Sequence, residues 1–155
     1  MTLQRAQLDR TVRWIARLVL AGVFLYAGYS KAFPVEHRLQ FEITLSTYQL
    51  LPPWAVIAVA RVLPWLEIAL GVLLLVGWQL RYFAAFTALL LTAFMIAMGI
   101  TYARGIEANC GCFGFGEPIS PQSLLRDSAF LVLALYLTVS AWRTARATAL
   151  QAQPG

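Results

Sequence analysis

The segment 82–103 contains no charged residue and is made mostly of aliphatic and aromatic side chains. A helix needs about 20 residues to cross the hydrocarbon core of a bilayer, and this segment is long enough to do so. Three further apolar stretches, at residues 14–33, 54–78 and 122–142, each carry a few charges. The chain is 60% hydrophobic and 12% charged, whereas a soluble domain is roughly 25% charged. The sequence therefore predicts an all-α membrane protein, a four-transmembrane-helix bundle that forms a single membrane domain over residues 1–155.

Four spans divide the charged residues unevenly between two sides. The side that holds both termini carries seven arginines and one aspartate, a net charge of +6, whereas the rest of the chain has five basic and six acidic residues. Because cytoplasmic segments of membrane proteins are enriched in Lys and Arg, both termini are predicted to be cytoplasmic. The net charge of +5 is thus a topology signal, and no nucleic-acid binding is expected. The charged residues of the terminal side are Arg5, Asp9, Arg10, Arg13, Arg17, Arg81, Arg143 and Arg146.

Two loops are predicted on the outer side. Within the first, residues 35–49 are amphipathic enough to form a short interfacial helix on the membrane surface. The second loop, residues 104–120, ends at Ser120 and Pro121, which are an N-cap residue and a proline in the first helical position. The fourth span is therefore expected to begin there.

The second outer loop contains both cysteines of the chain, Cys110 and Cys112, and faces an oxidising compartment. A disulfide between them requires a bend, which Gly111 permits. Such a strained bond is labile and closes almost no loop, so it contributes little stability. This favours a redox pair, in which one thiolate forms a mixed disulfide with an external protein and the other resolves it. Gly114 and Gly116 allow a partner's backbone to approach closely.

Other interpretations of the cysteines remain open at this point. Two thiolates bind copper(I) or zinc, and His37 in the first outer loop is the available third ligand. The cysteines also fit a staple in a non-catalytic assembly subunit of a membrane complex. If the pair is redox-active, electrons cannot cross the membrane by thiol exchange, because the chain has no other cysteine. The electrons then pass to another external protein or to a membrane quinone.

Glu67 lies about halfway along the second span, three residues after Pro64. A charge at the centre of a bilayer costs about 2.5–3.5 kcal/mol on insertion scales, so such a residue is expected to pair or to line a site. The candidate partners are Lys31, Arg61 and Arg126, and Arg126 is placed to meet Glu67 across the bundle. Asp127 is expected to face another direction. These groups form either a polar clamp between helices or a site that handles protons or a quinone head group.

These residues resemble the MauE family, the methylamine-utilisation membrane proteins, within the wider DoxX-like superfamily. The similarity covers about residues 13–142. It depends on Ala27-Gly-Tyr-Ser-Lys31, Tyr48 with Leu51-Pro52, Leu63-Pro64-x-x-Glu67, and above all Cys110-Gly-Cys-Phe-Gly114 followed by Arg126-Asp127.

The resemblance implies a multi-pass protein of the bacterial plasma membrane whose cysteine loop faces outside. It also implies a role in disulfide formation or maturation of exported proteins, with a thioredoxin-like partner or client outside the cell. Related DoxX-like proteins associate with quinone-linked redox enzymes. Association into a membrane complex or a homo-oligomer is left open by the sequence.

Overall fold

The computed structural model describes residues 2–33, 35–111 and 117–151, and these residues form five helices joined by turns and loops, with no strand. The elements are α1 (Thr2–Ala32), α2 (Val35–Thr47), α3 (Pro53–Val76), α4 (Leu80–Ala103) and α5 (Pro121–Gln151). Four of them, α1, α3, α4 and α5, are long and apolar enough to cross a membrane. This confirms the predicted all-α fold with four spans.

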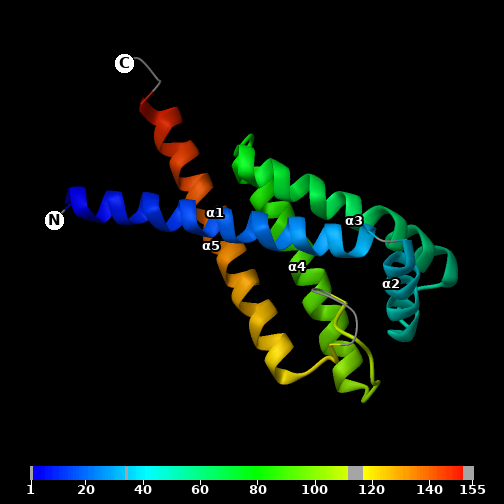
Figure 1. Ribbon diagram of the computed structural model, residues 1–155. Coiled ribbons are helices and arrows are strands. Elements are labelled where there is room, and N and C mark those ends of the chain that lie inside the picture. Colours follow the sequence, from blue (N-terminus) through cyan, green and yellow to red (C-terminus); the bar gives the residue numbers. More distant parts are fainter. Residues whose placement is uncertain (1, 34, 112–116, 152–155) are drawn as a thin grey trace.

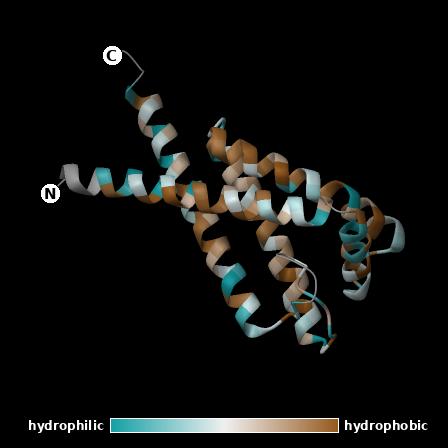
Figure 2. Cartoon of the chain, viewed as in Figure 1, coloured by the Kyte–Doolittle hydropathy of each residue, from teal (hydrophilic) through white to brown (hydrophobic). Residues whose placement is uncertain are grey.

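Two of the helices are longer than the apolar segments that predicted them. Helices α1 and α5 continue well beyond the apolar stretches, and their polar ends project from the molecule (Figures 1 and 2). The extra turns are rich in Ala, Gln, Arg and Leu, which favour helix without needing to be buried. The predicted short helix in the first loop is present as α2, and α5 begins at Pro121 as expected. There the Ser120 hydroxyl accepts a hydrogen bond of 3.2 Å from the Ser123 N–H.

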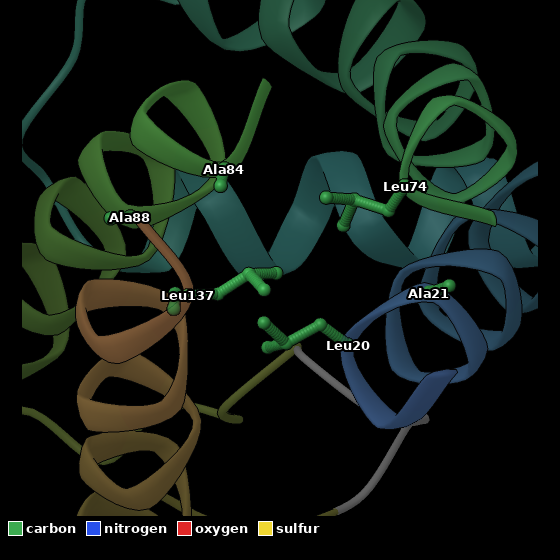
Figure 3. Close-up of a cluster of buried hydrophobic side chains, with 7 residues drawn as sticks. Leu20, Ala21, Leu74, Ala84, Ala88 and Leu137 are labelled. Carbon is green, nitrogen blue, oxygen red and sulfur yellow. The ribbon is translucent and has the colours of Figure 1, made fainter. Parts of the chain in front are cut away.

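The four long helices form two pairs, since α1 packs mainly along α3 and α4 mainly along α5 (Figure 1). The pairs meet in a buried cluster to which all four helices contribute, and small alanines on α4 and α5 let the backbones approach closely (Figure 3). The residues of this cluster are Leu20, Ala21, Leu74, Ala84, Ala88, Ala134 and Leu137. Many large apolar side chains away from it are exposed, as expected of helices that face lipid.

The two ends of the bundle are built differently. At the hairpin end, where α3 turns into α4, Gly77 caps α3 with a φ of 76° and donates its N–H to the Leu73 carbonyl. Arg17 of α1 covers this turn and donates to the carbonyl of Leu75 over 2.6 Å. At the cysteine end, opposite, α2 packs on α3 and the loop between α4 and α5 begins (Figure 1).

At Gly28 the backbone of α1 lies close to the backbone of α3. A methyl group added there would place its carbon 2.6 Å from the carbonyl oxygen of Pro64 and 2.9 Å from the backbone nitrogen of Ile68. Because neither backbone atom can move cheaply, Gly28→Ala should lower the free energy of unfolding by about 1–3 kcal/mol. Thermal unfolding of the purified protein in detergent measures this change. Gly22→Ala is the matched control, since nothing lies within 4 Å of the added carbon, and equal melting temperatures would contradict the prediction.

Candidate functional site

The backbone around Cys110 is fixed by a short antiparallel contact at the base of the loop between α4 and α5, the cysteine loop. The Cys110 N–H donates to the Glu117 carbonyl over 2.7 Å, and the Ile119 N–H donates to the Ala108 carbonyl over 3.0 Å. Gly111 follows with a φ of 68°, a conformation that glycine adopts without strain. The chain therefore turns immediately after Cys110.

The sulfur of Cys110 is buried among side chains of α4 and α5, with the residue only 1% exposed. Its proton can be donated to the thioether of Met98 at 3.4 Å or to Oδ2 of Asp127 at 3.5 Å. The Nη2 atom of Arg126 lies 3.8 Å from the same sulfur. A carboxylate that can accept the thiol proton and a cation that favours the thiolate therefore face one cysteine.

Arg126 connects this cysteine to two acidic residues. Its Nη1 atom donates to both carboxylate oxygens of Glu117, at 2.8 and 3.0 Å, and its Nε atom donates to Oδ1 of Asp127 at 3.2 Å. Asp127 is 3% exposed, whereas the side chains of Arg126 and Glu117 are about one third and two fifths exposed. The guanidinium thus links the buried cysteine site to the edge of the cysteine loop.

Tyr48 holds the cysteine backbone from the α2 side. Its hydroxyl lies 3.0 Å from the carbonyl oxygens of both Asn109 and Cys110, and the residue is buried. A buried tyrosine normally has a partner for its hydroxyl, and here the partner is the loop itself. Sequence reasoning singled out neither Tyr48 nor Glu117 as a site residue. The pattern Tyr48 with Leu51-Pro52 was the available signal for Tyr48.

A second polar centre lies inside the bundle, where Lys31 of α1 meets Glu67 of α3. The Lys31 Nζ atom is 3.0 and 2.9 Å from the two carboxylate oxygens, and the side chains are 2% and 7% exposed. The same ammonium also donates to the Ala27 carbonyl at 3.3 Å and lies 5.5 Å from the ring centre of Phe41. Glu67 is thus paired within the bundle.

The Lys31–Glu67 pair and the cysteine site share one small cavity. Its volume is about 30 Å³, and both Glu67 and Asp127 line it, together with apolar side chains that include Phe94, Met95 and Met98. That space suffices for a water molecule but not for a ring compound. The two buried carboxylates therefore approach the same interior space from α3 and α5.

The partners of the interior charges differ from two expectations. Arg126 does not meet Glu67 but pairs with Glu117 and Asp127, and it is Asp127 that turns toward the cavity beside Glu67. The reason is helical geometry, because adjacent residues on a helix point about 100° apart. Lys31, one of the three candidate partners, pairs with Glu67, while Arg61 is exposed on α3.

The remaining predicted site residues can be placed only in part. Cys112, Gly114 and Gly116 lie outside the described residues, so the structure describes Cys110 and Gly111 of the loop pattern. His37, the third ligand of the alternative metal set, lies on α2 with Nδ1 3.0 Å from the Ser30 carbonyl oxygen. Within residues 2–33, 35–111 and 117–151, no group of three or more His, Cys, Asp or Glu side chains is arranged to hold a metal ion.

Comparison with known proteins identifies the family to which the chain is similar. The sequence model of the family described as methylamine utilisation protein MauE matches residues 9–140. The chain is 35% identical to the methylamine utilization protein MauE of Paracoccus denitrificans, over 80% of this chain and 67% of that protein. It is 34% identical to the protein of the same name from Methylophilus methylotrophus, over 81% of this chain and 62% of that protein.

A more distant relative carries a different name. Protein TlpB of Flavobacterium psychrophilum is 29% identical, over 78% of this chain and 35% of the relative. No solved structure matches the chain. The chain therefore spans about two thirds of the length of the MauE relatives and about one third of TlpB. Because the family match covers residues 9–140, which include the cysteine loop and most of the four spans, the chain belongs to the family of the methylamine utilisation protein MauE.

Proposed function

We propose that the chain is a membrane thiol–disulfide redox protein that supports disulfide formation or maturation of extracytoplasmic proteins through Cys110 and Cys112. The observation that carries the proposal is the environment of Cys110, whose sulfur lies beside a carboxylate, a guanidinium and a thioether inside the bundle. A cysteine that only filled space would need neither charge beside it. We place the protein in the bacterial plasma membrane, with the cysteine loop on the outer face.

The proposed reaction is thiol–disulfide exchange followed by reoxidation. A disulfide between Cys110 and Cys112 exchanges with two thiols of an external protein, which gains the disulfide while the pair becomes two thiols. Reforming the S–S bond removes two electrons and two protons from the pair. Asp127 is positioned to accept the proton of the Cys110 thiol, and Arg126 is positioned to stabilise the thiolate.

A membrane quinone is the electron acceptor that we propose, and an apolar groove offers space for it. The groove has a volume of about 360 Å³ and lies between α3 and α4 at the end of α2. Its lining is apolar except for the hydroxyl of Tyr48, and Leu90 and Phe94 line both this groove and the small cavity beside Asp127. When bound, a quinone supplies a two-electron, two-proton acceptor. The chain's own residues would enclose its ring and exclude water.

Counting thiols in the purified protein tests this function. Two thiols per chain after reduction should fall to none when a short-chain ubiquinone is added to the protein in liposomes. Cys110→Ser and Cys112→Ser should each retain one thiol, because a single cysteine cannot form the internal bond. A pair that stays reduced both with quinone and with the thiol oxidant diamide would refute a redox role. Copper or zinc bound in proportion to reduced thiols would favour metal handling instead.

A blocking variant tests the place of the quinone separately. Ala97→Trp puts a large ring into the groove and should slow quinone-driven thiol loss by at least about tenfold while diamide still oxidises the pair. The control is Leu89→Trp on the same helix, where the side chain is 64% exposed outside the groove. Equal rates of quinone-driven thiol loss in the two variants would show that the quinone does not bind in this groove.

A further inference from the structure

A groove at the hairpin end of the bundle is independent of the cysteine site. It lies between α1 and α5, far along both helices from the outer loop, and its volume is about 340 Å³. The polar residues that line it are Asp9 and Arg13 of α1 and Tyr136, Ser140, Arg143 and Thr144 of α5. A groove of this size accommodates a small polar ligand.

Aromatic side chains mark the level of this groove in the membrane. Trp14 follows Arg13 in the sequence and Trp142 precedes Arg143, so both groove arginines lie next to tryptophans. The guanidinium of Arg81 lies 5.3 Å from the ring centre of Trp142, at the start of α4. Tryptophan and tyrosine concentrate at the membrane–water interface, which is where phospholipid head groups lie.

The donors of the groove suit an anion. Arg13 and Arg143 supply two guanidinium groups, and the Thr144 hydroxyl accepts a hydrogen bond from Nη1 of Arg13. The hydroxyls of Ser140 and Thr144 donate their own protons to the carbonyls of Leu137 and Ser140. Asp9 is the one acidic side chain among the lining residues. The hairpin end of the bundle, with the two terminal segments, has a net charge of +6, which raises the local concentration of anions.

We propose that this groove binds the head group of an anionic phospholipid that carries hydroxyl groups, of the phosphatidylglycerol type. The phosphodiester lies between Arg13 and Arg143, and a head-group hydroxyl donates to Asp9. The acyl chains follow the apolar surface of α5 that leads away from the groove, where Val132, Leu135 and Val139 are 65%, 49% and 50% exposed. Basic pockets between transmembrane helices on the cytoplasmic side recognise anionic lipids by the same chemistry.

Thermal unfolding of the full chain in a neutral detergent tests the lipid site. Short-chain phosphatidylglycerol should raise the melting temperature, because a ligand that binds only the folded state stabilises it. Phosphatidylcholine with the same chains and inorganic phosphate should leave it unchanged. Arg13→Gln with Arg143→Gln should weaken the apparent affinity about 25-fold, at about fivefold for each arginine removed.

The control is Arg38→Gln with Arg104→Gln, which removes two arginines from the cysteine end of the bundle and should leave the response to phosphatidylglycerol intact. Native mass spectrometry gives a second measurement that does not depend on stability, with one phosphatidylglycerol retained per parent chain and none per groove variant. A melting temperature raised equally by phosphatidylcholine, or a full response in the groove variant, would overturn the proposal. An equal effect of inorganic phosphate would show an anion site without lipid recognition.

Discussion

Cys110→Ser should trap a mixed disulfide between Cys112 and an external protein in intact cells, whereas Cys112→Ser should trap about tenfold less. The bond forms when the remaining thiolate attacks a disulfide of the oxidised partner and releases one partner thiolate, which is the reverse of the proposed exchange. The difference follows from the burial of Cys110, which is 1% exposed and surrounded by Met98, Asp127 and Arg126. A partner's sulfur must approach the attacking sulfur directly, and these side chains occupy the approach. We therefore assign the bond with the partner to Cys112 and the resolving step to Cys110.

For Cys110 to react with a partner, the side chains that bury its sulfur must move away and leave it open. Opening breaks the bonds from Tyr48 to the loop carbonyls and the link from Arg126 to Glu117. Net contributions of about 1 kcal/mol for each hydrogen bond, and more where a charge takes part, keep the open state a small fraction of the population. The predicted difference in trapping between the two variants is the consequence of this equilibrium.

The measurement is non-reducing electrophoresis of cells in which free thiols have been blocked with acid and alkylating reagent. The double variant Cys110→Ser with Cys112→Ser is the control and should show no trapped species. Equal trapping by both single variants would show that Cys110 is open to partners and would reverse the assigned order. Absence of trapped species in both, with client disulfides unchanged, would contradict the proposed redox function itself.

The architecture was predictable because it depends on long apolar segments. The charge-free stretch that became α4 predicted a span directly, and Ser120 with Pro121 predicted where α5 begins. The pairing of α1 with α3 and α4 with α5 was not predictable, because it depends on close backbone approaches such as that of Gly28 to Pro64. A sequence shows that a glycine is present but not which helix it faces.

The candidate site was predictable in its residue types but not in its contacts. Glu67 called for a partner because an isolated charge is costly in a bilayer, and Lys31 was among the three candidates. The choice among them depends on helix rotation, as the positions of Arg126 and Asp127 show. Tyr48 is distant from Cys110 in the sequence, and only the packing of α2 brings its hydroxyl to the loop.

Lys31→Met should destabilise the protein by about 3–5 kcal/mol, because it leaves the carboxylate of Glu67 buried without its ammonium partner. Glu67→Leu should destabilise the protein by a similar amount, because it leaves the ammonium group of Lys31 buried without its carboxylate partner. The double variant should recover most of the loss, since two apolar side chains of similar size remove both desolvated charges. Arg104→Met, which removes an exposed charge after α4, should change stability by less than about 0.5 kcal/mol.

Unfolding in mixed detergent and sodium dodecyl sulfate measures these free energies, and thiol counting on the same variants separates the two roles of the pair. If Lys31 and Glu67 only clamp α1 to α3, the double variant should regain both stability and quinone-driven thiol oxidation. If Glu67 takes part in proton handling through the cavity that it shares with Asp127, the double variant should be stable but slow to oxidise. A stable Lys31→Met variant would contradict the clamp, because it would show that α1 and α3 stay packed without the ion pair.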